Sequence, residues 1–255
     1  MQKVFIVSTG RTGTLFMREF FKLFPEVFSC HEPNPDFCNL GTNYARGIIS
    51  SHQAVQENEK GRRVLCCEVK RRKAKIYIES NNRLFSFLKP LREVFPDAKI
   101  VHIVRDGRDY VRSGMSGKWY EKDDKTTLRL RADMFHDDPY ANKWQQMSSF
   151  EKIAWLWQKK DGFIYQNDGR SGLFKISNFI GFSEEKTLSC LEKIGDYKPH
   201  NTRTSKHKIP KYPHWDEAMK SSFNEIASEQ QKIPNLTGQK YIQQNLILEY
   251  LHQNT

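Results

Sequence analysis

Apolar residues in this chain fall into short continuous runs separated by segments in which they recur at helical spacing. Strands are predicted from the short runs at 4–7, 27–28, 64–69, 76–78, 99–104 and 173–176. Helices are predicted at 15–24, from residue 80 or 81 to 95, at 152–165, at 182–194, and as two helices around Pro234 within 216–252. This alternation predicts a three-layer α/β/α domain with a central parallel sheet and P-loop topology.

The first strand leads into a glycine-rich segment that has the features of a phosphate-binding turn. Gly10 and Gly13 are surrounded by the hydroxyl residues Ser8, Thr9, Thr12 and Thr14. A strand, a glycine turn and a helix together direct backbone N–H groups at an anion, and Arg11 adds a planar cation. The Lys-Ser/Thr pair of nucleoside triphosphatases does not follow Gly13. The segment therefore predicts a phosphate site of another type.

A second motif follows the strand predicted at 99–104. The strand ends at Arg105, the chain is expected to turn at Gly107, and Ser113 lies eight positions after the arginine on a helix. Arg105 can form a bidentate charged fork on a phosphate, and the Ser113 hydroxyl can donate to it. Asp106 is placed to cap the helix. Two phosphate motifs thus lie about 95 residues apart, each at a strand-to-helix turn.

Together the two motifs resemble those of sulfotransferases that use 3′-phosphoadenosine 5′-phosphosulfate (PAPS). The resemblance covers residues 3–35 and 80–115, and its arginine-bearing loop is more similar to the carbohydrate and tyrosylprotein branches than to the small-molecule cytosolic branch. It implies that Arg105 and Ser113 bind the 3′-phosphate. It implies that the 5′-phosphosulfate is bound by Gly10, Arg11, Thr12, Gly13, Thr14 and Leu15. PAPS is then the cofactor, PAP is the product, and no metal is required.

The resemblance also indicates catalytic residues. Glu32 lies 21 positions after Arg11, near the place of the acidic general base in the tyrosylprotein and carbohydrate branches. A carboxylate there could take the proton of an attacking hydroxyl. His31 is the neighbouring alternative, because the small-molecule branch uses a histidine base. Arg11 is expected to assist catalysis as well as binding.

The tyrosylprotein branch also has a catalytic lysine near the end of its third strand. That place corresponds to Glu79–Ser80 in this chain, which holds no lysine. Lys70, Lys73 or Lys75 could reach the site from a loop, and the spacing does not select one of them.

The remaining chain is interpreted as part of one domain over residues 1–255. Aromatic residues in the charged segment 115–146 could line an acceptor pocket. The basic segment 198–215 is expected to cover the cofactor, because sulfotransferases tend to close the nucleotide with such a loop. Arg203, Lys206 and Lys208 are its candidate cofactor-binding residues.

Composition bounds the partners and the compartment. Lys and Arg outnumber Asp and Glu by 41 to 30, an excess that favours an anionic ligand or partner. Five cysteines, an odd number with no CxxC pair, indicate a reducing compartment and hence a cytoplasmic protein. Cys66 and Cys67 lie in an apolar run and are expected to be buried. No apolar run has the length of a membrane span.

The predicted function is the transfer of a sulfuryl group from PAPS to a hydroxyl, or less readily an amine, of a small-molecule, glycan or peptide acceptor. Two alternatives remain open. A nucleoside or nucleotide kinase would need a P-loop lysine and Mg²⁺ ligands. A basic nucleic-acid-binding protein would explain the charge and the basic cluster Lys70–Lys73, but not the spacing of Arg105 and Ser113.

Overall fold

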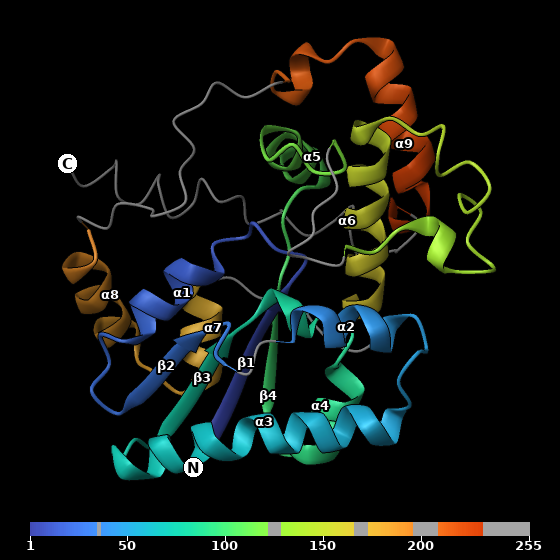
Figure 1. Cartoon of the computed structure of the whole chain (residues 1–255). Coiled ribbons are helices and arrows are strands. Elements are labelled where there is room, and N and C mark those ends of the chain that lie inside the picture. The colour runs from blue at the N-terminus through green and yellow to red at the C-terminus, as the bar shows by residue number, and fades with distance from the viewer. Residues whose placement is uncertain (35–36, 122–128, 166–172, 196–208, 232–255) are drawn as a thin grey trace.

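A parallel four-stranded sheet forms the centre of the molecule (Figure 1). The computed structural model describes residues 1–34, 37–121, 129–165, 173–195 and 209–231. Within them the strands are β1 (Gln2–Ser8), β2 (Val27–His31), β3 (Ile76–Ser80) and β4 (Lys99–Ile103). Their order across the sheet is β2-β3-β1-β4, and every pairing is parallel. The predicted sheet type is confirmed.

Helices cover both faces of this sheet. They are α1 (Thr14–Phe21), α2 (Cys38–Ala45), α3 (Ser51–Arg71), α4 (Leu88–Val94), α5 (Gly107–Ser116), α6 (Ser149–Tyr165), α7 (Leu173–Ile180), α8 (Glu184–Lys193) and α9 (Glu217–Gln231). Short 3₁₀ turns occur at η1 (Asn82–Leu84), η2 (Ala132–Met134) and η3 (Tyr212–His214). No described helix combines the length and apolarity needed to cross a membrane.

The alternation of side chains along β1 divides the core into two layers. Val4 and Ile6 pack with residues of α1, α7 and α8, whereas Phe5 and Val7 pack with residues of α3, α4 and α6. Because the sheet is buried on both faces, its strands read as continuous apolar runs in the sequence. The three-layer α/β/α architecture is confirmed.

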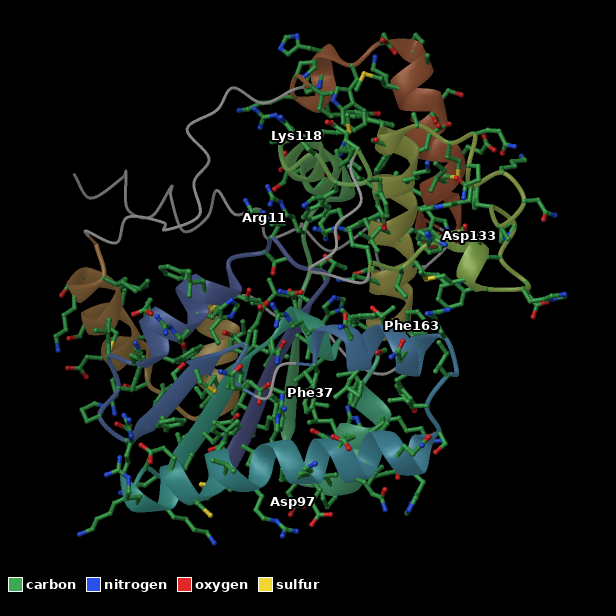
Figure 2. The ribbon with its side chains drawn as sticks, in the orientation of Figure 1. Arg11, Phe37, Asp97, Lys118, Asp133 and Phe163 are labelled. Carbon is green, nitrogen blue, oxygen red and sulfur yellow. The ribbon has the colours of Figure 1, made fainter. Side chains whose placement is uncertain are left out.

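Strand register brings the functional loops to one edge of the sheet. Ser8 pairs with Ile103, and His31 pairs with Ser80, so the segments that follow β1 and β4, and β2 and β3, leave the sheet side by side. Figure 2 shows Arg11 at this end of the sheet and Asp97 at the other. In parallel sheets, the carboxyl edge of the strands is where ligands bind.

Two predicted strands are wrong. Residues 64–69 belong to the 21-residue helix α3, and residues 173–176 begin helix α7. Helix α3 starts at a capping box in which Ser50 and Gln53 satisfy each other's backbone N–H groups. The apolar run at 64–69 therefore lies within an established helix, and Val64 is 70% exposed. Cys66 is half-buried and Cys67 is exposed, so their predicted burial is also wrong.

The helix predicted from residue 80 or 81 is shorter than expected. Asn81 accepts a hydrogen bond from the backbone N–H of Arg83 at 2.9 Å and starts the tight turn η1 instead. The α-helix begins only at Leu88. The predicted caps at Asp106 and Ser183 are confirmed, since their side chains accept from the N–H groups of Arg108 and Lys186.

A buried ion pair joins α3 to the end of β3. Arg62 and Glu79 have fully buried side chains, and Arg62 Nε donates to Glu79 Oε2 at 3.0 Å. The same carboxylate accepts from Tyr77 Oη at 2.6 Å and from Asn81 Nδ2 at 2.8 Å. The Arg62 guanidinium lies 4.0 Å from the centre of the Phe37 ring, which Figure 2 shows between α3 and the strands. This network holds the strand end from which the site continues.

We expect Arg62→Met to lower the free energy of unfolding by about 3–5 kcal/mol, because Glu79 would be left as an uncompensated buried charge. Urea unfolding followed by circular dichroism measures the change. The matched control is Arg63→Met on the same helix, whose pair with Glu59 is exposed and should contribute at most about 1 kcal/mol. Equal losses in the two variants would show that the buried pair has no special role.

Candidate functional site

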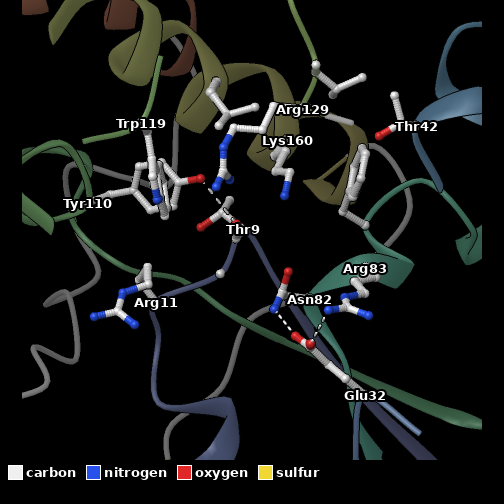
Figure 3. Close-up of a pocket in the computed structure, with 14 residues that line it drawn as sticks. Thr9, Arg11, Glu32, Thr42, Asn82, Arg83, Tyr110, Trp119, Arg129 and Lys160 are labelled. Carbon is white, nitrogen blue, oxygen red and sulfur yellow. Dashed lines mark hydrogen bonds and ion pairs between the residues drawn. The ribbon is translucent and has the colours of Figure 1, made fainter. Parts of the chain in front are cut away.

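A pocket of about 200 Å³ lies at the carboxyl ends of β1, β2 and β3 (Figure 3). Its lining combines residues of the glycine-rich loop, the turn after β3, the segment before η2, and helices α2, α5 and α6. The lining residues are Thr9, Gly10, Arg11, Glu32, Thr42, Asn82, Arg83, Phe85, Tyr110, Trp119, Arg129, Leu130, Leu156 and Lys160.

Positive φ angles shape the loop after β1. Gly10 has φ 100° and Gly13 has φ 84°, both of which glycine adopts without the strain a Cβ would cause, and Arg11 has φ 58°. Ser8 Oγ accepts from the Gly10 N–H at 3.1 Å and fixes the start of the turn. Helix α1 follows directly, with no side-chain cap on its first N–H groups. The loop therefore places left-handed residues directly before a helix N-terminus, a conformation in which successive backbone N–H groups can converge on an anion.

The second motif is bonded directly to this loop. Arg11 Nε donates to Ser113 Oγ at 2.9 Å, although the two residues are 102 positions apart. The Arg105 guanidinium donates to the carbonyl oxygen of Arg11, and Tyr110 Oη donates to that of Thr9 at 3.3 Å. The two segments that the sequence identifies as phosphate motifs therefore form one continuous surface.

Helix α6 supports the second motif from behind. Trp157 Nε1 donates to the carbonyl oxygen of Arg105 at 3.1 Å. A Cβ at Gly107 would lie 2.7 Å from the Trp157 indole, so glycine is required there by close packing. Gly107 is the first residue of α5 and not a turn residue of positive φ, which corrects the role expected from the sequence.

Several buried donors of this surface have no hydrogen-bond partner among the described residues. They include the Thr12 hydroxyl, Arg105 Nε and Arg112 Nε. Burial lowers the pKa of Arg105, and the neighbouring charges of Arg11 and Arg112 act in the same direction against Asp109 and Asp106. Buried donors and clustered cations of this kind fit an anion with several oxygens, such as a phosphate.

Glu32 enters the pocket from the end of β2. Its backbone has a φ of 41°, in the left-handed region that non-glycine residues rarely adopt. The Glu32 N–H donates to the Ser80 carbonyl oxygen at 3.1 Å. One carboxylate oxygen accepts from the Asn82 amide, and the other lies 3.1 Å from the Arg83 guanidinium, as Figure 3 shows. The carboxylate is therefore held in the same pocket that residues of the glycine-rich loop line.

His31, the alternative candidate for the general base, has a different environment from Glu32. Its Nδ1 lies 2.9 Å from the Ser80 carbonyl oxygen, which can only accept, so Nδ1 carries the proton in this bond. Nε2 lies 3.8 Å from Glu32 Oε1. Burial lowers the pKa of His31, while the charge of Glu32 opposes the shift. As far as the described residues form it, the pocket lining contains Glu32 and not His31.

The lysines considered from the sequence lie away from the pocket. Lys70, Lys73 and Lys75 are exposed near the end of α3 and the start of β3, whereas the pocket lies at the other end of that strand. Glu79 occupies the predicted lysine place and belongs to the buried network with Arg62. The lysine that does line the pocket is Lys160 of α6.

Other lining residues were missed by the sequence reasoning. Asn82 and Arg83 lie in η1, just after the end of β3, so the rule that ligands bind at the carboxyl ends of strands could have indicated them. Arg129 and Lys160 carry no such local signal. Within the predicted acceptor segment 115–146, Trp119, Arg129 and Leu130 line the pocket, whereas Trp144 is buried in the core. Arg203, Lys206 and Lys208 lie outside the described residues.

Comparison with known protein families identifies the family of this chain. The model of the sulfotransferase family matches residues 3–154, which is more than half of the chain and spans both phosphate motifs, Glu32 and the pocket-lining segments up to Leu130. The chain belongs to the sulfotransferase family. The family expected from the sequence is thereby confirmed, and its closeness to the carbohydrate and tyrosylprotein branches stays a prediction.

This sulfotransferase is also similar to solved structures of low sequence identity. One is the sulfotransferase domain of the Synechococcus PCC 7002 olefin synthase, with 13% identity, 91% of this chain and 94% of that chain covered, and a TM-score of 0.47. Another is the sulfotransferase domain from the curacin biosynthetic pathway, with 12% identity, 90% and 97% covered, and a TM-score of 0.48. No curated protein matches the chain.

The environment of His31 predicts a pH-dependent stability. Because its pKa is lowered on folding from about 6.5, the unfolded chain binds the proton more readily. The contribution of neutral His31 to the free energy of unfolding is complete above pH 6.5. This contribution is lost as the pH falls through 6.5 toward the lowered pKa of the folded state. Urea midpoints at pH 7, 6 and 5 should therefore fall more steeply for the wild type than for His31→Gln.

A control for this comparison is His136→Gln, since the His136 side chain is 99% exposed and should leave the pH dependence as in the wild type. Parallel pH curves for the wild type and His31→Gln would show that burial does not hold His31 neutral.

Proposed function

We propose that this sulfotransferase moves a sulfuryl group from PAPS to a hydroxyl group of an acceptor held in the pocket beside Glu32. One observation carries the proposal: the hydrogen bond between Arg11 and Ser113 joins two phosphate motifs that are distant in sequence, at the rim of a pocket that contains a carboxylate. A phosphate-binding surface adjoining a general base is what transfer from a nucleotide donor to a hydroxyl requires.

The donor would be held by the continuous surface of the two motifs. The loop N–H groups from Gly10 to Leu15, the Thr12 hydroxyl and Arg11 would bind the 5′-phosphosulfate, and Arg105 with Ser113 would bind the 3′-phosphate. Bound PAPS supplies the activated sulfuryl group. We also assign Arg203, Lys206 and Lys208 to cover the nucleotide, on the basic character of their segment alone.

Glu32 would act as the general base. Its carboxylate accepts the proton of the acceptor hydroxyl, which makes that oxygen nucleophilic as it attacks. Asn82 and Arg83 hold the carboxylate in one orientation, so little reorganisation is needed at the moment of reaction. Arg11 and the loop N–H groups stabilise the negative charge that develops on the phosphate side of the breaking bond. His31, whose Nδ1 is bonded to Ser80, would position the end of β2.

The alternative functions are not favoured. A kinase of the P-loop class would need a lysine after Gly13, and this chain has Thr14 there. The match to the sulfotransferase family favours sulfuryl transfer over phosphoryl transfer. The basic cluster Lys70–Lys73, which suggested nucleic acid, lies at the exposed end of α3, away from the pocket. We further propose that the reaction needs no divalent metal and takes place in the cytoplasm.

Arg105→Ala is expected to weaken PAP binding by about 1.5–3 kcal/mol, the usual contribution of a hydrogen bond to a charged group. Calorimetry should compare PAP with AMP, which differs from PAP only in lacking the 3′-phosphate. The wild type should prefer PAP, and the variant should lose most of this preference while its affinity for AMP stays nearly unchanged. Lys193→Ala, on the exposed surface of α8, is the control. A PAP affinity unchanged in Arg105→Ala would remove this assignment.

Glu32→Gln keeps the shape of the side chain and removes the proton acceptor. We expect kcat to fall roughly 10²–10⁴-fold, the usual contribution of a general base, with PAP affinity nearly unchanged. The assay uses labelled PAPS and any hydroxyl acceptor that the wild type sulfates. Glu217→Gln, exposed on α9, is the matched control. Near-normal turnover in Glu32→Gln, with the large loss in His31→Gln instead, would make His31 the base.

A further inference from the structure

Two hydrogen-bond donors of the pocket have no partner in the part of the chain that the structure describes. Thr9 is 1% exposed, and its hydroxyl is buried without a hydrogen bond. Trp119 makes ring contacts in the pocket but no hydrogen bond through its indole N–H. Trp157 and Trp215, in contrast, each donate this N–H to a backbone carbonyl oxygen. Polar groups taken out of water are normally hydrogen-bonded, so the two donors of the pocket call for a ligand.

Tyr110 of α5 positions both donors. Its hydroxyl donates to the carbonyl oxygen of Thr9 at 3.3 Å, and its ring meets the Trp119 ring edge to face, with the ring centres 5.5 Å apart. Figure 3 shows Tyr110 and Trp119 together above Arg11, with Thr9 beside them. Burial raises the pKa of Tyr110, so its hydroxyl keeps the proton that it shares with Thr9. One buried side chain thus fixes the distance between the two donors.

The backbone around Trp119 has an unusual conformation. Lys118 has φ 55° and Tyr120 has φ 61°, so left-handed residues lie on both sides of the tryptophan. Such angles are costly for residues that have a Cβ, and they are typical of functional sites. A Cβ at Gly114 would lie 2.8 Å from the Trp119 ring, so the glycine makes room for the indole. Backbone strain and close packing therefore hold this indole at the pocket.

The two donors lie where the transferred group would be. Among the described lining residues, the glycine-rich loop contributes Thr9, Gly10 and Arg11. The Asn82 side chain, which holds Glu32, would lie 3.6 Å from a Cβ at Gly10. The loop residues of the pocket therefore adjoin the group that positions the base. In-line transfer places the sulfuryl group between the phosphate on the loop and the acceptor oxygen beside the base.

We propose that Thr9 and Trp119 form a binding site for the sulfuryl group during transfer. The inference rests on the proposed function, since it takes PAPS as the donor and Glu32 as the base. The acceptor oxygen forms its bond to sulfur as the bond from sulfur to the 5′-phosphate oxygen breaks. The acceptor proton passes to Glu32, and the electron pair of the broken bond stays on the phosphate of PAP.

Thr9 and Trp119 keep their protons throughout this step. The Thr9 hydroxyl, turned into the pocket by rotation about χ1, and the Trp119 N–H donate hydrogen bonds to the sulfuryl oxygens that are not in the breaking bond. Negative charge is spread over these oxygens in the transition state, as it is in phosphoryl transfer. Donors that are already in place stabilise this charge without reorganisation.

Thr9→Val keeps the shape of the side chain and removes the hydroxyl. With labelled PAPS and a hydroxyl acceptor that the wild type sulfates, kcat should fall about 10–100-fold, the effect of one lost hydrogen bond to a charged group. Thr9→Ser should retain most of the turnover. The free chain loses no hydrogen bond in Thr9→Val, so its urea midpoint should not decrease.

The matched control is Thr187→Val on α8. The Thr187 hydroxyl is also buried, but it donates to the Ser183 carbonyl oxygen at 2.9 Å. This variant should therefore have a lower urea midpoint and normal turnover, the opposite of Thr9→Val. A midpoint that falls as far in Thr9→Val as in Thr187→Val would show that the Thr9 hydroxyl has a structural role, and would overturn its assignment.

Trp119→Phe removes the indole N–H and keeps an aromatic ring. Calorimetry with PAPS and with PAP, both without acceptor, isolates the contribution of the sulfuryl group. The ratio of PAPS affinity to PAP affinity should fall severalfold in Trp119→Phe and in Thr9→Val, with PAP affinity nearly unchanged. Trp215→Phe, whose N–H is bonded to the Pro210 carbonyl oxygen, is the control and should keep the ratio. An unchanged ratio and normal turnover in either variant would overturn the assignment of that residue.

The two proposals fail separately. A wild type that transfers the sulfuryl group from PAPS, with Thr9→Val and Trp119→Phe equally active, would contradict the sulfuryl site alone. A wild type that binds neither PAP nor PAPS would contradict the proposed donor, and the sulfuryl site with it.

Discussion

The parallel pairing of β1 with β4 is the constraint on which the site depends. It places Ser8 opposite Ile103, so the glycine-rich loop and the segment of Arg105 leave the sheet at the same height. A shift of one residue would turn Val4 and Ile6 toward the wrong layer of the core, so packing far below the site enforces the register. The bonds that Arg11 makes with Ser113 and Arg105 are possible only because this register is fixed.

At the end of β3, one side chain has a structural role at the position where the tyrosylprotein branch has a catalytic lysine. From the resemblance to that branch we expected a lysine near Glu79–Ser80. Here Glu79 is fully buried and paired with Arg62, so it supports the strand end from below. Asn82 and Arg83, which follow this strand end, in turn hold Glu32. Among the described residues, the lysine that lines the pocket comes instead from α6, 80 positions later in the chain, as Lys160.

The sequence predicted those parts of the fold whose signals are local. Strands β1 and β4 and the turns that follow them were readable, because an apolar run, glycines and an arginine lie within a few residues. The run at 64–69 was misread, since an apolar stretch alone does not distinguish a strand from part of a helix that a capping box began at Ser50. Arg129 and Lys160 could not be assigned to the pocket, because only tertiary packing brings the segment before η2 and helix α6 to the loop.

Helix α6 serves both halves of the proposed site at once. Trp157 holds the carbonyl of Arg105 from one side of the helix, while Leu156 and Lys160 line the pocket from another. In the proposed site, a displacement of α6 would therefore affect both ligands, and thermodynamic linkage would make the effect of each ligand on the affinity of the other equal. In the proposed site, acceptor specificity would consequently be easier to change at Arg129, before η2, than on α6, where a substitution would also affect nucleotide binding.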